Sequence, residues 1–310
     1  MLPRTACTFL VLVGAASTAV LSASAGRASS TPAPPLTSFA LASSDFRSGG
    51  VILSQSTSKQ GGMSTFIRTF RPGARLSGAP LLSVVSLVML EPDAETAAAD
   101  FTDLNGTAQS IRGRDAIGKA FAESFVQGWT KSAHAPKLTV RKTVVGRPTM
   151  FGESSLHLPV RLATNRGTFP LAVEVTQIDR VISIVYLAGQ IDARVSSADS
   201  ALARSLSRQH ATGAFAVGSA APPTISGAAG AGQTLAIDEG TWTGSPTRFD
   251  YAWARCDASG ASCVAIEGAT ARTYVPTAAD AGFTIRAAVT AANSVSSLQA
   301  TSSATTPIVR

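Results

Sequence analysis

Hydrophobic and polar positions alternate with a period of two through much of the C-terminal third of the chain. Residues 251–256 alternate in this way, residues 257–262 are turn-forming, and residues 263–266 alternate again. This pattern predicts a β-hairpin, with Cys256 and Cys263 at its two shoulders. The remaining cysteine, Cys7, lies in a segment that we expect to be removed. A disulfide in this hairpin requires an oxidising compartment, so the pattern predicts an exported protein.

A continuous apolar run and two helical stripes occupy the first half of the chain. Residues 81–90 are almost entirely apolar, which suits a strand that is covered on both faces. Asp93 then favours the start of a helix, whose apolar positions recur at helical spacing as far as Leu104. We expect Asn105-Gly106 to end this helix. A second helix is predicted over residues 115–127.

Strict alternation returns from Leu138 onward. Four runs predict an antiparallel meander: residues 138–145, 156–162, 169–175 and 181–187. In the second run Leu156, Leu158, Val160 and Leu162 point inward, while His157 and Arg161 point outward. Pro159 and Pro170 cannot donate a hydrogen bond within a sheet, so we expect their strands to be edge-like or irregular there. Glu153 and Glu174 are expected to pair with Arg161 or Arg166 across strands.

A closing helix is predicted over residues 196–210, with Ser196 or Ser197 as its N-cap. The order of elements describes an α+β sandwich, in which helices pack on one or both faces of an antiparallel sheet. The apolar strand 81–90 with its Ala-rich helix, and the strands of 156–187 with the helix ending at His210, carry a resemblance to PsbP-like and Mog1-like domains of secreted sensors and lipoproteins. That resemblance implies a domain over residues 36–213 that binds a ligand or partner. It transfers no functional residue.

The first 25 residues have the layout of a secretory signal peptide. Arg4 precedes an apolar run, and Ala23-Ser24-Ala25 fits cleavage before Gly26. An uncleaved membrane anchor is the alternative, because residues 6–25 approach the length of a membrane span. Residues 26–35, rich in Ser and Pro, predict an extended tether.

Short motifs in a fixed order mark residues 222–310. They are Gly240-Thr-Trp242, Tyr251-x-Trp253-x-x-Cys256, Gly268-Ala-Thr270, Thr273-Tyr274 and Asp280-x-Gly282. This order strongly resembles the bacterial extracellular Ig-like repeat, and the resemblance implies an all-β Ig-like sandwich with Trp253 in its core. It implies a module that spaces or docks the first domain at the cell surface. The two cysteines depart from antibody domains, because they close a local hairpin. Residues 214–221 are the predicted linker between the domains.

The net charge of +7 belongs to the first domain. Residues 26–215 carry 20 Lys and Arg against 13 Asp and Glu, whereas residues 216–310 carry 5 against 6. A basic surface suits an anionic cell-envelope polymer, and a scattered, solvated surface is the alternative. No Lys or Arg run typical of a nucleic-acid-binding tail is present, so no nucleic acid is expected as a partner. The candidate anion-binding residues are Arg141, Lys142, Arg147 and Arg161.

Motifs that carry chemistry are scarce. The three histidines, His134, His157 and His210, have no spacing typical of a zinc site. No Gly-x-Ser-x-Gly elbow, phosphate loop or EF-hand loop is present. Glu91, Asp93 and Glu95 are explained by the start of a helix. We therefore predict no catalytic residue, no metal site and no cofactor.

These observations predict a secreted or cell-surface binding protein without enzymatic activity. Its partner is unidentified, and a cell-envelope polymer or another surface protein fits the layout. Contact with a membrane is expected only if the signal segment stays attached. The alternative is a secreted hydrolase, which would need a pocket in the first domain that holds His134 or His157 beside a carboxylate and a hydroxyl.

Overall fold

The computed structural model describes residues 34–310 except residues 61 and 131–138. The predicted signal peptide, almost all of the tether, Cys7 and His134 lie outside the described residues. The chain divides into two compact units between Thr212 and Gly213. The described residues include no helix that is long and apolar enough to cross a membrane.

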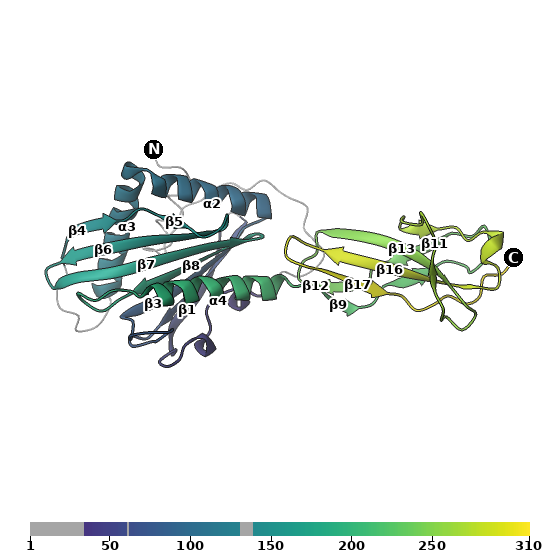
Figure 1. Ribbon diagram of the computed structural model, residues 1–310, viewed down its shortest axis with the longest axis horizontal. Helices are drawn as coiled ribbons and strands as arrows, with labels where there is room; N and C mark the ends of the chain where they lie inside the picture. The colour runs from purple at the N-terminus through teal and green to yellow at the C-terminus, as the bar shows by residue number, and fades with distance from the viewer. Residues whose placement is uncertain (1–33, 61, 131–138) are drawn as a thin grey trace. The chain divides into compact units, whose positions relative to one another are not determined.

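The first unit is built on one eight-stranded sheet, in which all paired strands are antiparallel. Its strand order is β1-β2-β3-β8-β7-β6-β4, and β5 also pairs with β6 (Figure 1). The strands are β1 (Ile52–Gln60), β2 (Met63–Phe70), β3 (Ser83–Leu90), β4 (Val140–Val145), β5 (Thr149–Met150), β6 (Ser155–Thr164), β7 (Gly167–Ile178) and β8 (Val181–Ala188). This sheet contains the predicted meander, as β4, β6, β7 and β8.

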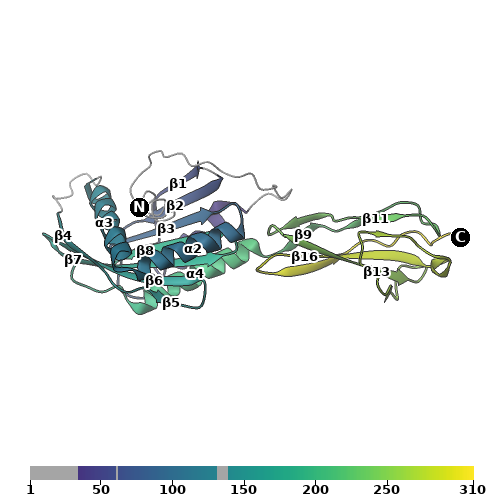
Figure 2. The same cartoon turned by 90° about the horizontal axis from the view of Figure 1, so that it is seen from above.

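Helices cover both faces of this sheet (Figures 1 and 2). The helices are α2 (Ala94–Gln109), α3 (Ile111–Thr130) and α4 (Ser197–Phe215). On one face, the stripe of α2 that includes Phe101 packs with the inward residues of β6, β7 and β8. On the other face, Ala203 of α4 packs with Val185 and Leu187 of β8 and with Leu41 from the N-terminal segment. An antiparallel sheet with helices on both faces agrees with the predicted α+β architecture.

The alternation of β6 decides which side chains reach which face. Leu156, Leu158, Val160 and Leu162 are at most 2% exposed and belong to the core beneath α2, as their spacing predicts. The residues between them, including His157 and Arg161, must therefore project toward the face that α4 covers. The outward side of this strand thus faces a second layer of the protein.

The predicted end of helix α2 at Asn105-Gly106 is wrong. The helix continues to Gln109, and Ser110 follows it. Leu104 and Ala108 are both buried on the same stripe, so burial of the next turn offsets the roughly 1 kcal/mol cost of a glycine inside a helix. Ser110 then accepts a hydrogen bond from the Gly113 N–H at 2.9 Å and starts α3.

The second unit is β-rich and has its own core. Its strands are β9 (Gly218–Ala221), β10 (Thr224–Ser226), β11 (Leu235–Asp238), β12 (Thr241–Thr243), β13 (Arg248–Cys256), β14 (Val264–Ala265), β15 (Thr273–Tyr274), β16 (Thr284–Ala292) and β17 (Ser297–Thr301). They form sheets of the orders β14-β13-β16-β17, β10-β11-β15 and β12-β9. Trp253 is 1% exposed in the core of the unit, and its Nε1 donates to the Ala271 carbonyl at 2.9 Å.

Residues 214–221, which we predict to be the linker, lie in regular structure at both ends. Helix α4 continues to Phe215, and β9 pairs with β12. A Cβ atom on Gly218 would lie 2.6 Å from the Thr243 hydroxyl on the paired strand, so a larger residue at this position would require the Thr243 side chain to move.

The predicted hairpin pairs β13 with β14, and Cys256 is disulfide-bonded to Cys263. We predict that replacing both cysteines with serine lowers the stability of β13 and β16 by about 2.5 kcal/mol, because the bond closes only a short loop in the unfolded chain. Amide hydrogen exchange, followed peptide by peptide, measures this loss. Protection in the first unit should stay unchanged, and global unfolding of the second unit would contradict the prediction.

Candidate functional site

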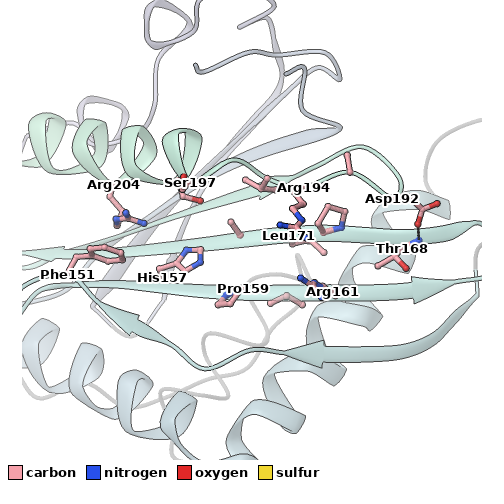
Figure 3. Close-up of a pocket in the computed structure, with 16 residues that line it drawn as sticks. Phe151, His157, Pro159, Arg161, Thr168, Leu171, Asp192, Arg194, Ser197 and Arg204 are labelled. Atoms are coloured by element: carbon pink, nitrogen blue, oxygen red, sulfur yellow. Dashed lines mark hydrogen bonds between the residues drawn. The ribbon is translucent and has the colours of Figure 1, made fainter. Parts of the chain in front are cut away.

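A pocket of about 490 Å³ lies between α4 and the neighbouring strands β6 and β7 of the first unit (Figure 3). Its walls come from β6, from the first part of β7, from the loop before α4 and from the first two turns of α4. The residues that line it are Phe151, His157, Pro159, Val160, Arg161, Thr168, Pro170, Leu171, Ala172, Asp192, Ala193, Arg194, Val195, Ser197, Ser200 and Arg204. Its volume suits a small organic molecule.

Two prolines mark the place where sheet pairing is interrupted. Pro159 lies on β6 between the residues that pair with β4 and those that pair with β5. Pro170 lies on β7 just beyond the last residue paired with β8. A proline lacks the N–H that a sheet needs from a central strand. The predicted irregularity is therefore present, and both prolines line the pocket.

Glu174 lies beneath the pocket and is the most deeply buried charged group near it. It is 1% exposed on β7, and its two carboxylate oxygens have different partners. Oε1 is 2.6 Å from His157 Nδ1, and Oε2 accepts a hydrogen bond from Arg204 Nη1 at 2.5 Å. A carboxylate oxygen accepts hydrogen bonds, so His157 Nδ1 is the donor in this contact. One carboxylate therefore links β6, β7 and α4.

Further contacts fix the side chain of Arg204. Its guanidinium carbon lies 3.8 Å from the centre of the Phe151 ring, a cation–π contact. One turn later, Arg208 donates to the Ser155 hydroxyl at 2.9 Å. The cation on α4 is thus held by a carboxylate on one side and by an aromatic ring on the other, which leaves it little freedom to reorient.

The loop before α4 forms the opposite wall, and reciprocal hydrogen bonds attach it to β7. The Thr168 N–H donates to Asp192 Oδ1 at 2.9 Å, and the Asp192 N–H donates to the Thr168 carbonyl at 2.8 Å. Ser196 then caps α4 by accepting from the Asp199 N–H at 3.0 Å, so the N-cap is Ser196. This wall is therefore held by backbone groups at several points.

Asp199 occupies the first turn of α4 and is bonded away from the pocket. It accepts hydrogen bonds from Ser77 and Gly78 and from Ser196. Burial alone would raise the pKa of Asp199, but the hydrogen bonds from Ser196, Ser77 and Gly78 outweigh it and hold the pKa below its ordinary value. The positive end of the helix is already matched by this carboxylate.

Arg161 and Arg194 are the two cations of the pocket that have no counter-charge. Arg161 projects from β6, and Arg194 comes from the loop before α4 (Figure 3). Both are exposed. Among the described residues, no side chain forms an ion pair or a hydrogen bond with either guanidinium group.

The four candidate anion-binding residues lie on the paired strands β4 and β6 and on the segment that follows β4. Arg141 and Lys142 lie on β4, Arg147 lies in the connection between β4 and β5, and Arg161 lies on β6. All four are exposed, and only Arg161 lines the pocket. Their role in binding an anion stays a prediction.

The expected partner of Glu174 was wrong. Its carboxylate binds His157 and Arg204 and not Arg161 or Arg166. Arg166 lies in the hairpin between β6 and β7, on no strand face, and alternation gave no information about α4. The period-two pattern could have found the His157–Glu174 pair, because the two residues are directly opposite on neighbouring strands. Nothing in the local sequence identified Arg204 or Arg194.

The arrangement contains part of what a hydrolase needs. A histidine that is oriented by a carboxylate can act as a general base. Among the described residues, however, no hydroxyl or thiol forms a hydrogen bond with the ring of His157. His210 is elsewhere, with Nε2 2.8 Å from Asp45. Within the described part of the chain, no cluster of three or more His, Cys, Asp or Glu side chains could hold a metal ion.

The acidic residues at the start of α2 form no second site. Asp93 is the N-cap and accepts from the Thr96 N–H at 2.7 Å, as helix-start chemistry predicts. Glu91 is different, because it is 4% exposed and its Oε1 has no hydrogen-bond partner among the described residues. Burial, with smaller contributions from Asp100 and Asp93, raises the pKa of Glu91 to about 7.

No protein-family model matches the chain, and no curated protein matches it. Among solved structures, it is similar to the extracellular domain of PknH from Mycobacterium tuberculosis, with 10% sequence identity and a TM-score of 0.27. The match covers 48% of this chain and 63% of that one, so the chain spans less than two thirds of its length. A TM-score this low carries no argument about the site.

The raised pKa of Glu91 predicts a pH-dependent stability. Its folded pKa of about 7 lies above the ordinary value of 4.5, so its stabilising protonated form is fully present below pH 4.5 and is lost as the pH rises through 7. Glu91→Gln stays neutral and should stabilise the first unit at pH 8 by up to about 3 kcal/mol. At pH 4 it should have little effect.

Denaturant unfolding at both pH values measures this difference. Glu95→Gln is the matched control, because Glu95 is exposed in the first turn of the same helix. A Glu91→Gln effect of equal size at pH 4 and pH 8 would show that the carboxylate is not held in its neutral form.

Proposed function

We propose that the protein is an exported binding protein without enzymatic activity, and that its first unit takes a small ligand in the pocket between β6, β7 and α4. The observation that carries the proposal is the way in which the polar groups of this pocket are held. Glu174 fixes His157 and Arg204 from below, and the loop that carries Asp192 is bonded to β7. Preorganised polar groups on an apolar lining are typical of ligand sites.

The second unit serves in this proposal as an Ig-like module that spaces or docks the first unit at the cell surface. The motif order of residues 222–310 supports it, and so do the buried Trp253 and the disulfide of the β13–β14 hairpin. The disulfide also supports export, because such bonds persist in oxidising compartments.

A secreted hydrolase is the second candidate, and one observation favours it. His157 lines the pocket and is paired with a carboxylate, and two serines, Ser197 and Ser200, line the same pocket. The binding function is preferred, because neither hydroxyl is hydrogen-bonded to the histidine and because Arg204 shares the carboxylate. Catalysis by such a group depends on a positioned nucleophile.

Closing the pocket with a large side chain tests the proposed function. We predict that Ser197→Trp abolishes the binding of small molecules that bind the wild-type protein, because Ser197 is exposed and lines the pocket. Ala198→Trp is the matched control, since Ala198 is also exposed in the first turn of α4 but does not line the pocket. Saturation-transfer NMR with a library of soluble carboxylates, phosphates, amides and sugars provides the measurement.

Two outcomes would count against this function. Equal binding by the wild type and the Ser197→Trp variant would place the ligand outside the pocket. Recovery of the bound molecules in hydrolysed form, with conversion lost in His157→Ala, would instead support the hydrolase. The proposal expects every bound molecule to be recovered intact.

A further inference from the structure

We infer that the ligand of this pocket carries an oxyanion, a carboxylate or a phosphate, which Arg161 and Arg194 bind together; this rests on the proposed function of the pocket. Both residues line it, one from β6 and one from the loop before α4 (Figure 3). A planar guanidinium group with several donors matches the geometry of carboxylate and phosphate oxygens.

The balance of charge along the pocket supports an anionic ligand. Of the charged side chains at the site, Arg204 forms an ion pair with Glu174, whose other oxygen accepts a hydrogen bond from His157 Nδ1. The remaining carboxylate, Asp192, accepts from the Thr168 N–H, and no cation forms an ion pair with it among the described residues. Two arginines therefore oppose one carboxylate, and the pocket keeps a net positive charge.

Arg161 and Arg194 differ from the two arginines of α4 near the pocket, which bind other parts of the fold. Arg204 binds Glu174, and Arg208 binds Ser155. Arg161 and Arg194 have no such role, so replacing them should leave the fold intact. Two like charges at one pocket repel each other, and a bound oxyanion would remove this cost.

The rest of the lining indicates the body of the ligand. Pro159, Pro170, Leu171 and Val195 contribute apolar surface, and Phe151, which also lines the pocket, is 44% exposed. A compact apolar or aromatic group with an oxyanion at one end therefore fits the pocket better than a fully hydrated ion does.

A set of three probes of similar size tests the inference. Benzoate and phenyl phosphate present the two oxyanions, and benzamide has the shape of benzoate without its charge. We expect the mature chain to bind both anions, and the Arg161→Gln/Arg194→Gln variant to bind each at least about tenfold more weakly. The affinity for benzamide should be the same in both proteins. Dissociation constants come from NMR titration in buffer free of phosphate.

Arg71→Gln/Arg112→Gln is the matched control, because it removes the same charge from two exposed residues outside the pocket. It should bind both anions as the wild type does. An equal loss of affinity in this control would show diffuse attraction to a basic surface and overturn the inference. A preference for benzoate or for phenyl phosphate identifies which oxyanion the site takes.

The remaining outcomes separate this inference from the proposed function. If benzamide binds as tightly as benzoate, and both are lost in Ser197→Trp but not in the arginine variant, the pocket function stands and the oxyanion inference fails. If none of the three probes binds the wild type, the oxyanion inference fails, and binding of other library members in the pocket still supports the proposed function.

Discussion

The buried carboxylate of Glu174 is the constraint on which the site depends. A charge taken out of water must be paired and hydrogen-bonded, or it destabilises the fold. Glu174 meets this requirement with His157 on the neighbouring strand and Arg204 on α4. These two partners approach from different elements, so satisfying one carboxylate sets the position of the helix over the sheet. The pocket is the space between this helix and strands β6 and β7.

The second unit also contains a buried carboxylate, Asp280, but this one stabilises a turn. Asp280 is fully buried and accepts hydrogen bonds from Arg255, Tyr274 and the Thr277 N–H. Burial alone would raise the pKa of Asp280, but the hydrogen bonds from Thr277, Tyr274 and Arg255 outweigh it and hold the pKa below its ordinary value. The bonds from Thr277 and Tyr274 close a short helical turn before β16. The same physical requirement therefore stabilises a turn in the second unit and links a helix to two strands in the first unit.

Alternation and helix signals predicted most elements of the fold, because they depend on local periodicity. They identified the meander, the inward residues of β6 and the interruption at Pro159. They failed where tertiary burial outweighs a local signal, as at Gly106, where α2 continues through the glycine to bury Ala108. The site was predicted only in part. His157 and Arg161 have a strand pattern, but the positions of Arg194 and Arg204 depend on how α4 docks, which no local pattern specifies.

The coupling between Glu174 and Arg204 tests the central claim most directly. A double-mutant cycle with Glu174→Gln and Arg204→Leu, measured by denaturant unfolding of the first unit, isolates it. If the carboxylate holds α4 over the sheet, the two changes should be non-additive by about 2 kcal/mol, because either one leaves the other partner buried and unpaired. Additivity within about 0.5 kcal/mol would contradict the account.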